Sequence, residues 1–98
     1  MAIAMLQEME GVDAATYDKV NEKVGGLDAP PEGLLMHTAG MGENGLFRIF
    51  DVWESREAHE KFAEERLRPA IAEVVGEEAM QQGPTRQEFY ELHDFMGR

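Results

Sequence analysis

Two polar residues in apolar surroundings are the first candidates for chemistry in this sequence. His37 lies mid-way along a predicted strand, and the unperturbed pKa of its imidazole is close to working pH, so it can act as a general acid or base. Asp51 shares a strand face with Ile49 and Trp53, where an unpaired carboxylate would be costly. If Asp51 meets a histidine in a pocket, the two form an acid–base dyad.

Each of these residues also has a purely structural interpretation. His37 fits a buried or dimer-interface histidine whose nitrogen atoms are both satisfied. Asp51 fits a structural ion pair with Arg48, with Arg86 or with a histidine. The sequence leaves both interpretations open.

Four further residues extend the candidate site, namely Tyr17, Trp53, Tyr90 and His93. Tyr90 is predicted to be catalytic, because its phenol can donate a hydrogen bond to developing oxyanion charge. Trp53 is predicted to bind substrate by stacking, and its alternative is a core aromatic residue. Tyr17 can supply a pocket hydroxyl or belong to the buried stripe of its helix. His93, near the end of the last predicted strand, is expected at a pocket mouth.

No cofactor and no metal site is predicted. The chain has no cysteine, and its histidines have neither the spacing of a zinc motif nor that of neighbouring helix turns. No glycine-rich phosphate loop is present. His59 lies beside charged residues on a predicted helix and is expected to be solvated.

The predicted order of elements is strand, helix, strand, strand, helix, strand. The strands are expected at residues 2–9, 34–39, 46–53 and 86–93. Asp13 and Ser55 are predicted N-caps of the two main helices, and a polar connection is expected at residues 77–84. The order is that of an α+β, ferredoxin-like βαββαβ fold with an antiparallel four-stranded sheet, formed by a single domain over residues 1–98.

The strands near the centre of the chain are apolar on both faces. A sheet with helices on one face and water on the other shows apolar and polar residues in alternation. Here Leu34, Leu35 and Met36 are consecutive, and Phe50, Val52 and Trp53 are apolar at both parities. We therefore expect the second face to be covered by another copy of the chain, in a homodimer joined sheet to sheet.

The composition argues against several partners. The 20 acidic residues outnumber the 9 basic residues and give a formal charge of −11, which repels nucleic acid and anionic membranes. No run approaches the roughly 20 apolar residues of a membrane span. With no cysteine and no signal peptide, the sequence suggests a cytoplasmic protein.

The junction between the third strand and the second helix carries a family resemblance. Residues 50–62 read FDVWESREAHEKF, which resembles the VWxSxExxxxF junction of the dimeric α+β barrel superfamily, above all its small antibiotic-biosynthesis-monooxygenase-type members. The resemblance implies a homodimer with a pocket between sheet and helices. Trp53 matches the tryptophan that lines this pocket. The haem-degrading branch is disfavoured, because Glu8, Phe62 and Ala72 stand where it needs Asn, Trp and His.

Taken together, the sequence suggests a cofactor-independent, monooxygenase-like enzyme that acts on a hydrophobic or aromatic small molecule. In this hypothesis His37 is the base and Trp53 is the stacking wall. The alternative is a non-catalytic ligand-binding or dimerisation module of unknown function.

Overall fold

The computed structural model describes residues 2–25 and 30–96, which form four strands, four α-helices and one π-helical turn. The strands are β1 (Ile3–Met9), β2 (Leu34–Met41), β3 (Phe47–Trp53) and β4 (Arg86–Glu91). The helical segments are α1 (Ala14–Val24), α2 (Arg56–Phe62), the π-helix η2 (Ala63–Leu67), α3 (Arg68–Val75) and α4 (Glu77–Gln82).

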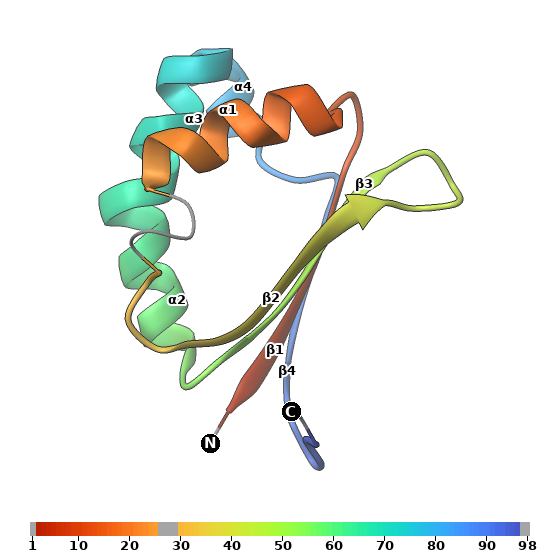
Figure 1. Cartoon of the computed structure of the whole chain (residues 1–98), viewed down its shortest axis with the longest axis vertical. Helices are drawn as coiled ribbons and strands as arrows, with labels where there is room; N and C mark the ends of the chain where they lie inside the picture. Colours follow the sequence, from red (N-terminus) through yellow and green to blue (C-terminus); the bar gives the residue numbers. More distant parts are fainter. Residues whose placement is uncertain (1, 26–29, 97–98) are drawn as a thin grey trace.

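The strands form one antiparallel sheet in the order β2-β3-β1-β4, and the helices lie on one side of it (Figure 1). This is the ferredoxin-like arrangement that the sequence predicts. The strand β3, which carries Asp51 and Trp53, lies between β1 and β2.

Both predicted N-caps form. The Asp13 carboxylate accepts a hydrogen bond from the backbone N–H of Thr16 at 2.8 Å, and the Ser55 hydroxyl accepts one from the N–H of Ala58 at 3.1 Å. Each bond satisfies a donor that a helix start leaves unpaired. Ser55 thereby fixes the point at which the chain leaves β3 and enters α2.

The helical segment after α2 widens into a π-helix immediately before a proline. Across this turn the Arg68 N–H donates to the carbonyl of Ala63, five residues back. Pro69 has no N–H, and in a regular α-helix its ring would crowd the carbonyl four residues earlier. The wider turn accommodates that ring. After α3, the helix α4 occupies residues for which the sequence predicts a polar connection.

Alternation along the strands defines two faces of the sheet. Ile3, Met5 and Trp53 form the core cluster, and Ala58 and Phe62 of α2 pack against it, so we call this side the helix face. The other side, the open face, carries the intervening residues, among them Leu6, Glu8, Phe50 and Tyr90.

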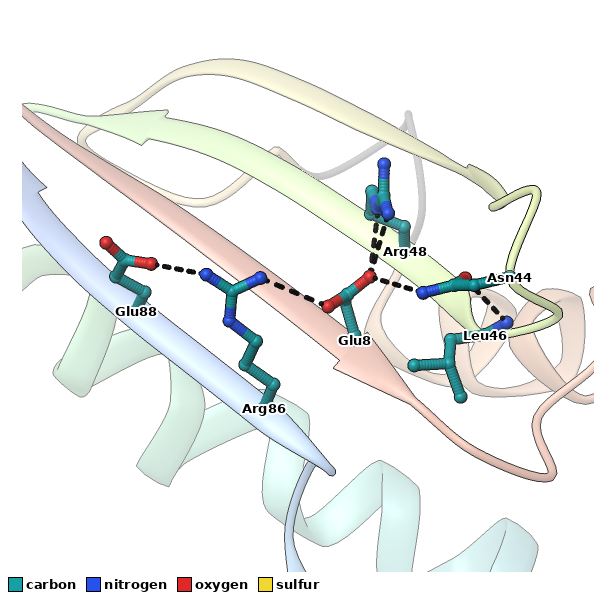
Figure 2. Close-up of polar contacts among 6 residues, drawn as sticks. All are labelled: Glu8, Asn44, Leu46, Arg48, Arg86 and Glu88. Atoms are coloured by element: carbon teal, nitrogen blue, oxygen red, sulfur yellow. Dashed lines mark hydrogen bonds and ion pairs between the residues drawn. The ribbon is translucent and has the colours of Figure 1, made fainter.

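A buried carboxylate organises one end of the open face. Glu8 is only 4% exposed, and it accepts hydrogen bonds from Arg48 on β3, Arg86 on β4 and Asn44 in the β2–β3 turn (Figure 2). The hydrogen bonds from Arg48 contribute most to lowering the pKa of the Glu8 carboxyl. The bonds of Glu8 to Arg48 and Arg86 tie three strands together, and Arg86 also binds Glu88 on its own strand.

Gly33 allows the chain to enter β2 beside α2. Its φ is +87°, its carbonyl accepts a hydrogen bond from the Glu54 N–H at 2.8 Å, and a Cβ at this position would lie 2.7 Å from the Cβ of Ala58. Gly45 has a similar φ of +83° but has open space where a Cβ would be. Gly33 and Gly45 therefore share a backbone conformation, but a side chain would be crowded only at Gly33.

We expect Gly33→Ala to destabilise the fold by more than about 2 kcal/mol, because overpacking adds to the cost of a positive φ. Gly45→Ala, the matched control, bears only the backbone cost of about 1 kcal/mol. Urea unfolding of both variants measures the difference. Equal losses would show that contact with Ala58 does not constrain the start of β2.

Candidate active site

A chain of two hydrogen bonds links three side chains from three elements. Asp51 on β3 and His37 on β2 are paired in the sheet register, so both side chains lie on the helix face. The His37 Nδ1 atom lies 2.6 Å from Asp51 Oδ1, and His37 Nε2 lies 2.6 Å from the Tyr17 hydroxyl on α1. We call this arrangement the relay.

The relay runs from a buried carboxylate to a more open ring. The Asp51 side chain is 8% exposed, whereas that of His37 is 37% exposed. The Tyr17 ring packs on the Phe47 ring, with centroids 5.1 Å apart, and lies nearly parallel to the imidazole. Asp51 therefore has a partner that offsets the cost of its burial, and that partner remains accessible.

The chemistry of the three groups fixes the direction of the hydrogen bonds. An ionised carboxylate only accepts, so His37 Nδ1 donates to Asp51. In the neutral imidazole Nε2 then has a free lone pair, and the Tyr17 hydroxyl donates to it. When His37 is protonated, Nε2 donates to the phenol oxygen instead. The Tyr17 oxygen is thus the end of the relay from which a proton can be exchanged.

The surroundings raise the pKa of both groups that can exchange a proton, His37 and Tyr17. The hydrogen bond to Asp51 raises the pKa of His37, and partial burial opposes this effect. Burial, followed by the negative charges of Asp51 and Asp18, raises the pKa of Tyr17. At neutral pH the phenol keeps its proton, and the imidazole is a stronger base than a free one.

Trp53 lies further along the same face of β3, in a cluster of aromatic rings. It is 1% exposed, and its ring centroid lies 5.3 Å from that of His59 and 5.6 Å from that of Phe62. His59 also contacts the Phe89 ring edge-to-face at 5.2 Å, and the Arg56 guanidinium covers Phe89. Within the described residues, neither Trp53 Nε1 nor His59 Nδ1 has a hydrogen-bond partner.

The prediction that His59 is solvated is wrong, because the residue is only 6% exposed. Burial lowers the pKa of His59, which favours the neutral imidazole. His59 precedes Phe62 by three residues, which places both on the same side of α2. That spacing could have identified His59 as a buried residue from the sequence alone. The charged residues next to it led instead to the prediction of a solvated side chain.

The structure brings together only some of the residues that the sequence nominates. Tyr17, His37 and Asp51 meet, and Trp53 lies on the same face two residues beyond Asp51. Tyr90 pairs with Ala4 and lies on the open face, 45% exposed, so it is on the opposite side of the sheet from His37. His93 follows the end of β4 and is exposed. Its role and that of Tyr90 stay predictions.

Two surface grooves lie away from the relay. One, of about 230 Å³, separates α1 from α3, and the other, of about 280 Å³, lies on the β2–β3 part of the open face beside Arg48 and Phe50. Neither groove is lined by a relay residue. In residues 2–25 and 30–96 no cluster of acidic and histidine side chains is arranged to hold a metal ion. None of the described helices is long and apolar enough to cross a membrane.

Comparison with known proteins identifies similar structures. No protein-family model and no curated protein matches the sequence. Rv0793 from Mycobacterium tuberculosis is similar over 99% of this chain and 100% of its own, with a TM-score of 0.69 and 13% identity. SnoaB, a cofactor-independent oxygenase from Streptomyces nogalater, matches over 99% and 97% of the two chains, with a TM-score of 0.61 and 13% identity.

A third similar structure was determined with a small molecule bound. This monooxygenase, ActVA-Orf6 of Streptomyces coelicolor in complex with nanaomycin D, matches over 99% of this chain and 91% of its own, with a TM-score of 0.58 and 19% identity. The chain has the fold of the antibiotic-biosynthesis-monooxygenase-type proteins. This confirms the fold implied by the FDVWESREAHEKF junction. At these identities the likeness concerns the fold alone and leaves the reaction to the residues of the site.

We expect Asp51→Asn to lower the pKa of His37, because the substitution removes the carboxylate that stabilises the imidazolium. Titration of the His37 ring resonances by NMR measures this change. In the wild-type chain the pKa of His37 is higher when folded than when unfolded. The pair therefore adds stability below the unfolded pKa, and this contribution is lost as pH rises through the folded one. Asp94→Asn, in the exposed tail, is the control and should leave the titration unchanged. An unaltered His37 pKa in Asp51→Asn would contradict the relay.

Proposed function

We propose that the protein is a small-molecule enzyme in which the Tyr17–His37–Asp51 relay removes a proton from a hydrophobic, aromatic substrate. The observation that carries this proposal is the pair of 2.6 Å contacts that joins a buried carboxylate to a phenol through one imidazole. A purely structural pairing of Asp51 would need only one partner. The additional phenol extends the chain of exchangeable protons toward α1.

Proton removal follows from the direction of the hydrogen bonds. The substrate gives its proton to the Tyr17 oxygen as the Tyr17 proton passes to His37 Nε2. Asp51 stabilises the imidazolium that forms, because the positive charge lies beside its carboxylate. The hydrogen bond at Nδ1 also holds the imidazole in the tautomer that can accept. The Tyr17 phenol is regenerated in the same step.

Cofactor-independent oxygenation is the reaction class that this proton transfer serves best. An anthrone methylene is acidic, and the carbanion left by deprotonation is electron-rich enough to react with molecular oxygen. Conversion of the methylene to a carbonyl consumes one O₂ and releases one water, so no further reductant is needed. The fold shared with SnoaB, a cofactor-independent oxygenase, and with the nanaomycin D-bound monooxygenase supports this class of reaction.

The relay predicts a definite pattern among variants. We expect His37→Phe and Tyr17→Phe to lower kcat for anthrone oxygenation by about 10²-fold or more, the usual contribution of a general base. In the wild-type protein kcat should rise with pH through the raised pKa of His37, and Asp51→Asn should move this rise to lower pH. An oxygen electrode measures the rates, and Asp94→Asn is the control.

The variant Tyr90→Phe distinguishes the prediction from sequence that Tyr90 is catalytic from the proposal that the relay carries out catalysis. A loss comparable to that of Tyr17→Phe would assign catalysis to the open face. Turnover that depends on none of Tyr17, His37 and Asp51 would contradict the proposed function.

A non-catalytic ligand-binding or dimerisation module is the second candidate function. The near-complete burial of Trp53 and the position of both grooves away from the relay favour it. In that case the relay would serve only to fasten α1 to the sheet. The relay variants would then reduce stability, while no oxygen consumption would be detected with the wild-type protein.

The open face supports the proposal that the protein is a homodimer. Leu6, Phe50 and Tyr90 lie on this face, and the groove of about 280 Å³ beside Phe50 hollows it. Tyr90 is among the exposed large hydrophobic residues. An isologous partner would cover this apolar surface and add to the limited core of a small domain.

We expect the wild-type protein to sediment as a dimer at micromolar concentration and Phe50→Asp to sediment as a monomer, since a charge on the open face opposes burial there. Val75→Asp is the matched control, because Val75 is an exposed apolar residue on α3. It should remain a dimer. A monomeric wild-type protein would contradict the proposal, and circular dichroism of Phe50→Asp verifies that the variant is folded.

A further inference from the structure

The strand β2 contains a bulge shortly before His37. Upstream of the bulge Leu34 pairs with Trp53. Downstream of it His37 pairs with Asp51, and this pair is one residue out of step with the first. Leu35 is therefore the extra residue of the bulge, and it is 48% exposed. A bulge of this kind leaves one residue out of the ladder and changes which residues of the strand face each side of the sheet.

A slip of β2 by one residue would remove the bulge. Leu34 would keep its partner, and Leu35 would enter the ladder. His37 would then lie opposite Phe50 instead of Asp51. Because such a slip turns each following side chain to the other side of the sheet, His37 would face away from the helices. We call this arrangement the slipped register, and in it the relay is broken.

The position of β2 in the sheet allows such a slip. It is an edge strand that pairs with β3 alone, so β3 and the loop after β2 must set its register. The Gly42 N–H donates to the Leu46 carbonyl at 2.9 Å, which leaves residues 43–45 as the turn, and Gly45 has the positive φ suited to its last position. The slipped register would shorten the turn to residues 43–44. Hairpin turns of both lengths are common, so the loop can take up the difference.

The Asn44 side chain holds the longer turn in place (Figure 2). Its Oδ1 atom accepts a hydrogen bond from the Leu46 N–H at 3.1 Å, and its Nδ2 atom donates one to Glu8 Oε2 at 3.3 Å. Glu8 lies on the inner strand β1 and is also bound by Arg48 and Arg86. Asn44 thus closes the longer turn and attaches it to a point that does not move with β2.

We propose that Asn44 is a positioning residue of the relay, because its bonds to Glu8 and Leu46 keep β2 in the register that places His37 opposite Asp51. The inference rests on the proposed function for the catalytic role of His37, whereas the register can be measured without any activity. The hydrogen-bond network on the open face thereby determines which side chain of β2 faces the helices.

NMR spectroscopy of Asn44→Ala tests the proposal directly. We expect a second set of β2 resonances, in which His37 has cross-strand NOEs to Phe50 instead of Asp51. Two hydrogen bonds are lost, and each contributes a factor of about five, so the slipped register should gain about tenfold or more in population over the wild-type protein. Glu88→Ala is the matched control, because it removes a bond of the same network but leaves the turn intact. It should show one register.

A second variant isolates the bond to Glu8. Asn44→Asp keeps an acceptor for the Leu46 N–H, but a carboxylate cannot donate to Glu8 and repels it. We expect this variant also to populate the slipped register, because the turn loses its attachment to β1. Circular dichroism verifies that both variants are folded.

Deletion of Leu35 provides a rescue that a merely structural role of Asn44 does not predict. Without this residue Leu34 and His37 both lie on the helix face of a regular strand. A slip in the shorter chain would move Leu34 off the helix face and out of its contact with the core. The Asn44→Ala substitution in the shorter chain should therefore leave a single register, in which His37 lies opposite Asp51.

Activity separates this inference from the proposed function. With an anthrone, kcat of Asn44→Ala should fall in proportion to the slipped population, and deletion of Leu35 should restore it. A single register in both Asn44 variants, with the NOEs between His37 and Asp51 retained, would overturn the inference. Oxygen consumption that depends on His37 would then still support the proposed function. A slipped register in these variants without any turnover by the wild-type protein would instead remove the enzyme and keep Asn44 as the residue that sets the register.

Discussion

The hydrogen bond between Asp51 and His37 is the interaction on which the helix face depends. A carboxylate on the central strand β3 is tolerated only because the paired residue on β2 donates to it. The same bond orients His37 Nε2 toward Tyr17, and this contact fastens α1 above the sheet. None of the α1 residues is fully buried, so Tyr17, with its contacts to His37 and Phe47, is a principal anchor of that helix.

The sheet buries one carboxylate on each face, and the partners differ in kind. On the open face Glu8 is held by Arg48 and Arg86, whose guanidinium groups stay charged at any accessible pH. That network can fix three strands but has no proton to exchange. On the helix face Asp51 is held by an imidazole, which gains or loses a proton near neutrality. The choice of partner thus makes one carboxylate structural and leaves the other able to assist chemistry.

The fold could be predicted from the sequence because its signals are local. The caps at Asp13 and Ser55 and the apolar residues of β3 each depend on a few neighbouring residues. The candidate site depends on register, which is not local. Without the register, Arg48, Arg86 and a histidine were equal candidates to pair with Asp51. Nor could the sequence show whether Tyr90 or Tyr17 lies on the same side of the sheet as His37. Pairing of Tyr90 with Ala4 places it opposite the relay.

The helix face holds the hydrogen-bonded relay beside Trp53 and His59, whose buried nitrogens have no hydrogen-bond partner among the described residues. Groups that are fully hydrogen-bonded in the free protein are held in place and can transfer a proton without prior rearrangement. Buried groups that lack partners cost about 1–3 kcal/mol each. In a domain of this size, whose total stability is about 5–15 kcal/mol, two such atoms are a considerable loss. An aromatic residue without a nitrogen at position 59 would avoid part of it.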